Sequence, residues 1–167
     1  LSDTELKITV NKATRTVTDN MPTDLVYTGT AISSSTYTTW FTKADTDGKL
    51  TVSLVGATEM KNAGEYTLSV SVAETDNYEA FSQDYTVTIA KATVTKPAKP
   101  AEKYTYNGYE YTFFTTSSLY YSYSNNTGKD AKDYDVTISL NDPNNYMWAD
   151  SLSSDAYSET ITIHKKD

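Results

Sequence analysis

Two stretches of the chain, "NAGEYTLSVSV" at residues 62–72 and "DAKDYDVTISL" at residues 130–140, decide the fold. In both, apolar side chains occupy every second position after a tyrosine, and polar side chains stand between them. This period of two is that of a strand with one buried face. The stretches align without a gap, so that Tyr66 matches Tyr134 at an offset of 68 positions. The sequence therefore predicts the same amphipathic strand twice.

Other short motifs recur on either side of these strands. Lys-Ala-Thr at residues 12–14 returns at residues 91–93, and a Tyr-x-Gly follows at the same spacing in both copies. The stretches "YTVTIAK" at residues 85–91 and "ETITIHK" at residues 159–165 match as closing strands. Self-similarity along a chain indicates repeated structural units, so we expect one folding pattern to occur twice.

We predict an all-β chain of two tandem domains, residues 1–91 and 92–167. The chain has 167 residues, of which 38% are hydrophobic and 13% aromatic, which is enough for two small cores. Its many Thr, Val and Tyr residues favour strands over helices. Residues 1–11 resemble a closing strand left over from a preceding copy, or they form the first strand of the first domain. Both interpretations stay open.

A proline-containing stretch, "TKPAKPAEK" at residues 95–103, has the composition of a flexible linker. It nevertheless occupies the same place in the second copy as "VTDNMPTD" at residues 17–24 in the first. Proline is tolerated at sheet edges and strand starts, because it cannot donate to a ladder. We therefore predict a kinked first strand rather than a free spacer.

The motifs together resemble a known family. "NAGEYTL" is similar to the tyrosine-corner motif of immunoglobulin-like domains, with Leu68 in place of cysteine and Tyr66 as the corner residue. The second copy keeps Tyr134 but has Lys132 in place of the glycine. In order and type, the motifs of both copies resemble the tandem bacterial immunoglobulin-like (MBG-like) repeats of secreted and cell-surface proteins.

This resemblance implies two tandem immunoglobulin-like β-sandwich domains, each held by its tyrosine corner. It implies an extracellular, non-catalytic spacer or adhesion module at the bacterial cell surface or wall, acting as a monomer whose partners are neighbouring repeats. No enzyme activity, cofactor or metal is expected. A module that binds a carbohydrate or a host surface protein is the alternative.

Charge and composition argue against several other functions. The net charge of −8, with Arg15 as the single arginine, disfavours nucleic acid binding. The chain has no cysteine, and its one histidine, His164, falls on a predicted strand without catalytic or metal-binding partners. No apolar run approaches the roughly 20 residues that a membrane-spanning helix needs.

The segment "DTDG" at residues 45–48 resembles the start of a calcium-binding loop, but the later ligands of such a loop are missing. Asp-Gly favours a hairpin turn, because glycine accepts a positive φ. We therefore predict a hairpin that joins residues 40–43 to residues 49–55.

Aromatic side chains are the candidate binding residues. Tyr120, Tyr121 and Tyr123 lie in "SLYYSYSNN" and must point to both faces if this stretch is extended. Trp148 and Tyr146 lie near the longer last loop of the second copy. Exposed rings can stack on sugars. The simpler interpretation, which we favour, is that these rings pack within the sheets.

Overall fold

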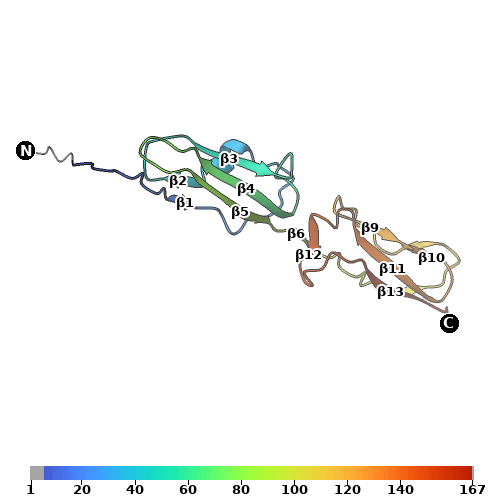
Figure 1. Cartoon of the computed structure of the whole chain (residues 1–167). Coiled ribbons are helices and arrows are strands. Elements are labelled where there is room, and N and C mark those ends of the chain that lie inside the picture. The colour runs from blue at the N-terminus through green and yellow to red at the C-terminus, as the bar shows by residue number, and fades with distance from the viewer. Residues whose placement is uncertain (1–5, 167) are drawn as a thin grey trace, which may run out of the picture. The chain divides into compact units, whose positions relative to one another are not determined.

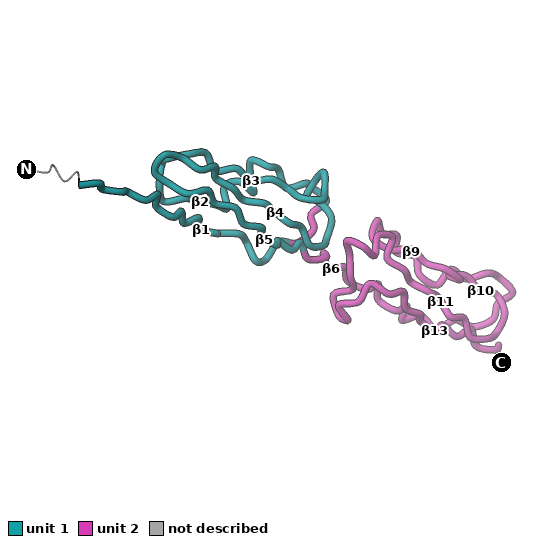
Figure 2. Tube along the Cα trace, viewed as in Figure 1, with its two compact units in different colours: residues 1–25, 29–89 teal, residues 26–28, 90–167 magenta. Residues whose placement is uncertain are grey.

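The computed structural model describes residues 6–166, and their secondary structure confirms the all-β prediction (Figure 1). One short helix and thirteen strands are present in this range. The chain divides into two compact units, of which unit 1 comprises residues 1–25 and 29–89 and unit 2 comprises residues 26–28 and 90–167 (Figure 2). The division after Ile89 lies two residues before the boundary that the sequence predicts. Residues 26–28 are the one segment that belongs to unit 2 although it precedes this division.

The elements of unit 1 are β1 Val17–Asp19, α1 Ser34–Thr38, β2 Phe41–Lys43, β3 Leu50–Val55, β4 Gly64–Val72 and β5 Phe81–Ile89. An antiparallel sheet has the order β3-β4-β5, and β1 pairs antiparallel with β2. The predicted alternation is confirmed in β4, where Leu68, Val70 and Val72 are almost fully buried. Helix α1 was not predicted. It is capped by Ser33, whose hydroxyl accepts a bond from the Thr36 amide.

The elements of unit 2 are β6 Ala92–Val94, β7 Tyr104–Thr105, β8 Tyr111–Thr112, β9 Tyr121–Ser124, β10 Thr127–Gly128, β11 Asp133–Leu140, β12 Tyr146–Trp148 and β13 Tyr157–His164. The main sheet has the order β7-β13-β11-β9, in which β7 runs parallel to β13. Two smaller sheets pair β8 with β10 and β6 with β12.

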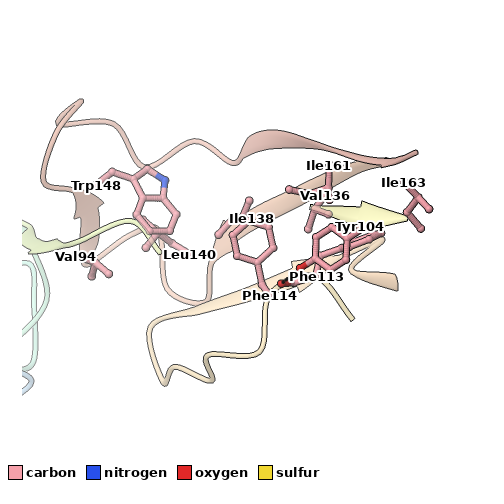
Figure 3. Close-up of a cluster of buried hydrophobic side chains, with 10 residues drawn as sticks. All are labelled: Val94, Tyr104, Phe113, Phe114, Val136, Ile138, Leu140, Trp148, Ile161 and Ile163. Carbon is pink, nitrogen blue, oxygen red and sulfur yellow. Dashed lines mark hydrogen bonds between the residues drawn. The ribbon is translucent and has the colours of Figure 1, made fainter. Parts of the chain in front are cut away.

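The core of unit 2 is a continuous cluster of buried side chains (Figure 3). Val136, Ile138 and Leu140 of β11 form its centre, and Ile161 and Ile163 of β13 lie beside them. The cluster is completed by Val94, Tyr104, Phe113, Phe114 and Trp148. Alternate positions of β11 and β13 are therefore buried as the sequence predicts.

The proline-containing stretch differs from the prediction. Only Ala92–Val94 forms a strand, and residues 95–103 form no ladder. Pro97 and Pro100 lack the amide hydrogen that a ladder needs. The stretch is tied to unit 2 by side chains instead, since Lys96 Nζ lies 3.0 Å from Asp150 Oδ2 and 4.4 Å from the centre of the Tyr157 ring.

The predicted hairpin at residues 45–48 is also wrong. Strand β2 pairs with β1 and strand β3 pairs with β4, so the Asp-Gly turn does not join two neighbouring strands. Gly48 does adopt the positive φ of 74° that favours glycine. Two positively charged side chains hold the turn: the Asp45 carboxylate accepts hydrogen bonds from Arg15 Nη1 at 2.6 Å and from Lys43 Nζ at 3.0 Å.

Arg15 is the centre of a buried polar network in unit 1. Its side chain is fully buried, and its guanidinium also donates to the carbonyl oxygens of Asp47 (2.6 Å) and Glu79 (3.0 Å) and to Thr75 Oγ1 (3.1 Å). The five donors of arginine can thus join segments that are far apart in the sequence. Burial acts to raise the pKa of Asp45, but bonds from Lys43 and Arg15 outweigh it and lower that pKa below its ordinary value.

We expect unit 1 to lose stability in acid because of Asp45. A carboxyl whose pKa is lower in the folded state stabilises that state above its unfolded pKa of about 4, and this contribution is lost as the pH falls below that value. The melting temperature of unit 1, followed by NMR between pH 6 and pH 2, should depend less on pH in Asp45→Asn than in the wild type. The exposed Asp24→Asn variant is the control, and equal pH dependence in all three proteins would contradict the prediction.

Candidate functional site

The candidate site is an open cleft in unit 2 with a volume of about 510 Å³. This volume falls within the range of roughly 300–1,000 Å³ that is usual for small-molecule sites. The cleft lies beside strand β6 and the first residues of β9 and β12. It is lined by Tyr27, Thr28, Ala92, Thr93, Val94, Thr95, Ser118, Tyr120, Tyr121 and Tyr146.

Tyr146 is placed in the cleft by the turn that precedes it. The Tyr146 amide donates to the Asp142 carbonyl at 3.0 Å, and the Asn145 side chain donates to Asp142 Oδ2 at 2.8 Å. Strand β12 then begins at Tyr146 and pairs in parallel with β6. The segment "NDPNN" at residues 141–145 therefore forms a turn, and this turn orients one wall of the cleft.

Tyr120 is the most exposed ring that lines the cleft, with 46% of its surface accessible. Its ring centre lies 5.1 Å from that of Tyr146, with the planes 60° apart, and Tyr27 meets Tyr146 edge-on at 5.4 Å. Asn141 holds the loop before β9, because its amide donates to the Tyr120 carbonyl and its side chain donates to the Leu119 carbonyl. Tyr27 and Tyr120 therefore both make edge-type contacts with Tyr146.

The structure separates the five aromatic residues that the sequence suggested for binding. Tyr120, Tyr121 and Tyr146 line the cleft. Trp148 does not, because it is 1% exposed, and its indole nitrogen donates to the Asp155 carbonyl at 2.8 Å. Tyr123 stacks on Phe114 at 5.0 Å and belongs to the rim of the core. Trp148 therefore offers no exposed ring, and Trp148 and Tyr123 both pack within unit 2.

Sequence reasoning did not place Tyr27 or the backbone of residues 92–95 at this site. In the sequence, Tyr27 stands out only as the first residue of the recurring Tyr-x-Gly motif, at residues 27–29 and 106–108. Its amide donates to the Ala90 carbonyl at 2.9 Å, and this bond places residues 26–28 with unit 2. No periodicity in the sequence indicates such a contact, because the two residues are more than 60 positions apart.

The side chains that line the cleft are all uncharged. Besides the tyrosines, they include the hydroxyl groups of Thr28, Thr93, Thr95 and Ser118. Burial raises the pKa of the Tyr146 hydroxyl above its ordinary value, and the neighbouring Tyr27 and Tyr120 add to this shift. Tyr146 therefore stays protonated and neutral at physiological pH. The cleft combines aromatic faces with neutral hydrogen-bonding groups.

The two corner tyrosines make corresponding contacts outside the cleft. The Tyr66 hydroxyl donates to the Asn62 carbonyl at 2.9 Å, and the Tyr134 hydroxyl donates to the Asp130 carbonyl at 3.1 Å. Gly64 has a φ of 146°, whereas Lys132 at the matching position is not among the described residues with positive φ. The hydroxyl bond is therefore made in both units despite the different residue at this position.

The side chains that could act in catalysis or bind a metal ion do not gather at one place in the described residues. His164 is exposed at the end of β13. Within residues 6–166, no three His, Cys, Asp or Glu side chains are grouped so that they could hold a metal ion. No helix in the same range is long and apolar enough to span a membrane.

Comparison of the sequence with protein-family models and with curated proteins finds no match, and no solved structure matches the chain.

We expect unit 2 to lose stability between about pH 10 and pH 12. Burial raises the pKa of Tyr123 and that of Tyr157 to about 12, above the value of about 10 for an unfolded tyrosine. The folded state therefore binds these protons more tightly, and the stability that this provides is lost as the pH rises from 10 to 12. Denaturation of Trp40→Phe, in which Trp148 is the only tryptophan left, measures this dependence.

The control for this prediction is Tyr157→Phe in the same background. Among the described residues, the buried Tyr157 hydroxyl has no hydrogen-bond partner, so its removal should leave unit 2 as stable at pH 7, or up to about 1 kcal/mol more stable. The alkaline loss of stability should become smaller. An unchanged dependence on pH would show that burial of this hydroxyl does not cause it.

Proposed function

We propose that this chain is a non-catalytic structural module of a bacterial extracellular surface protein. In this proposal its units are two immunoglobulin-like β-sandwich repeats of the MBG-like kind, which act as a monomer that spaces or displays other parts of a longer polypeptide. Its partners are neighbouring repeats. The proposal rests on how the strands of each unit pair, rather than on any reactive side chain.

Corresponding pairings in the two units support a repeated pattern. Tyr66 of β4 faces Val87 of β5, and Tyr134 of β11 faces Ile161 of β13. Tyr66 and Tyr134 occupy equivalent positions in the two aligned sequences, and so do their partners Val87 and Ile161. Because a shift of one residue would turn every side chain to the other face, an identical register supports a common pattern of burial.

The proposed load-bearing role rests on the parallel pairing of β7, near the start of unit 2, with its last strand, β13. In unit 2, Tyr104 and Thr105 of β7 pair in parallel with Ile163 and His164 of β13, and the Tyr106 amide donates to the His164 carbonyl at 2.9 Å. When the ends of the unit are pulled apart, β7, which follows β6, and the last strand, β13, are drawn in opposite directions. Several bonds must then break together in shear, which suits a module that bears load.

The test is single-molecule force spectroscopy on the full chain with Tyr106→Pro. Proline removes the Tyr106 amide donor, which is worth about 0.5–1.5 kcal/mol at equilibrium. We expect the force that unfolds unit 2 to fall clearly, because the lost hydrogen bond is one of those between residues 104–106 and β13 that resist the pulling force. The unfolding force of unit 1 should stay the same.

Tyr106→Ala is the matched control, because it removes the same ring and keeps the amide donor. Its unfolding force should remain close to that of the wild type. Equal forces in the proline and alanine variants, or gradual extension without separate unfolding events, would contradict a load-bearing role.

A second candidate function is the binding of a neutral glycan in the cleft. The observation that favours it is the lining, in which Tyr120, Tyr121 and Tyr146 stand among hydroxyl groups and no charged side chain. Sugars stack on aromatic rings and exchange hydrogen bonds with neutral groups. A charged ligand would find no counter-charge among the lining residues.

Calorimetric titration with a panel of neutral saccharides tests this second candidate. We expect Tyr120→Ala to weaken any specific binding about tenfold or more, equivalent to about 1.4 kcal/mol. Tyr109→Ala is the control, since Tyr109 is 76% exposed and lies outside the cleft. If no saccharide binds, or if both variants reduce binding equally, the cleft is not the site.

A further inference from the structure

Residues 6–12 carry an apolar stripe that the described chain leaves uncovered. Leu6, Ile8 and Val10 are 85%, 76% and 90% exposed, and they occupy alternate positions. In an extended chain, alternate side chains point to the same face. Residues 6–12 form no ladder with any other described residue. The stripe therefore offers one apolar face that another chain segment could cover.

The positions that correspond to Ile8 and Val10 are buried in both closing strands, β5 and β13. Ile8 and Val10 precede Lys-Ala-Thr at the spacing at which Val87 and Ile89 precede it near the end of β5. Both β5 side chains are 3% exposed. The corresponding side chains of β13, Ile161 and Ile163, are 4% and 1% exposed. In both closing strands, therefore, these positions belong to the core.

The chain that follows the stripe makes the same contacts as the chain that follows β5. The Ala13 amide donates to the Asn77 carbonyl at 2.8 Å, and the Ala92 amide donates to the Asn145 carbonyl at 2.9 Å. Ala13 forms a parallel bridge with Tyr78, and Ala92 pairs in parallel with Tyr146. Both units thus receive their incoming chain in the same way. In unit 2, the residues just before this point are the closing strand of another unit.

We propose that residues 6–12 are the closing strand of a further unit of this pattern, which precedes unit 1 in the natural polypeptide. In that unit, Ile8 and Val10 fill the places that Val87 and Ile89 fill in unit 1, and Leu6 takes the place of Tyr85. The segment pairs antiparallel with the central strand of the preceding unit, as β5 pairs with β4. This inference rests on the repeated pattern in the proposed function and is independent of the load-bearing role.

The first experiment asks whether the segment can close such a unit. Residues 159–165, which include most of β13, are replaced by the sequence of residues 6–12, so that Ile8 and Val10 fall at the positions of Ile161 and Ile163. We expect Trp148 fluorescence and near-ultraviolet circular dichroism to report a folded unit 2. In the matched control, the same graft carries aspartate in place of both Ile8 and Val10, and unit 2 should be unfolded.

The second experiment examines the segment in its natural context. The chain is extended at its N-terminus by about 80 natural residues, because the two Lys-Ala-Thr motifs at residues 12–14 and 91–93 lie 79 positions apart. We expect the amides of residues 8–10 to exchange at least about 100-fold more slowly than in the present chain, because they become part of a ladder. In the present chain, Ile8→Asp with Val10→Asp should leave the melting temperatures of both units unchanged.

Two results would overturn the proposal: a graft that leaves unit 2 as unfolded as its aspartate control, or unprotected amides in the extended chain. Either result would leave the force measurements on Tyr106→Pro unaffected. Failure of this inference can therefore be told apart from failure of the load-bearing role.

Discussion

Each unit depends on a central strand that is hydrogen-bonded on both sides and apolar on one face. Strand β4 lies between β3 and β5, and strand β11 lies between β9 and β13. Because side chains alternate across a strand, the register of both neighbours is set once the apolar face is buried. The central strand itself carries Tyr66 or Tyr134, and one of its two neighbours is the closing strand, β5 or β13.

The two units cover this apolar face with different side chains. Unit 2 uses rings, and Phe113, Phe114 and Trp148 complete its core. Unit 1 buries Tyr37 of α1, Phe41 of β2 and Met60, and joins its loops through the buried guanidinium of Arg15. A buried arginine must have partners for its donors, so this network specifies loop positions more strictly than apolar packing does.

The tyrosines show how residues of one type acquire different roles. Tyr123 and Tyr157 pack against the core of unit 2, Tyr120 lines an open cleft, and Tyr146 does both. The Tyr66 and Tyr134 hydroxyls bond back to the carbonyl four residues upstream. The cleft arises where the turn before β12 and the loop before β9 place their rings together. It therefore depends on how β6 pairs with β12, which is a contact between segments far apart in the sequence.

The sequence alone determined the all-β class, the two central strands and the closing strands, because alternation is a local signal that burial must satisfy. It also identified three of the residues that line the cleft, Tyr120, Tyr121 and Tyr146. Only the tertiary structure decided that Trp148 is buried, that β2 pairs with β1 rather than β3, and that residues 95–103 form no ladder. These features depend on which segments meet in space, and a pattern of alternating side chains shows that a face is buried without showing what covers it.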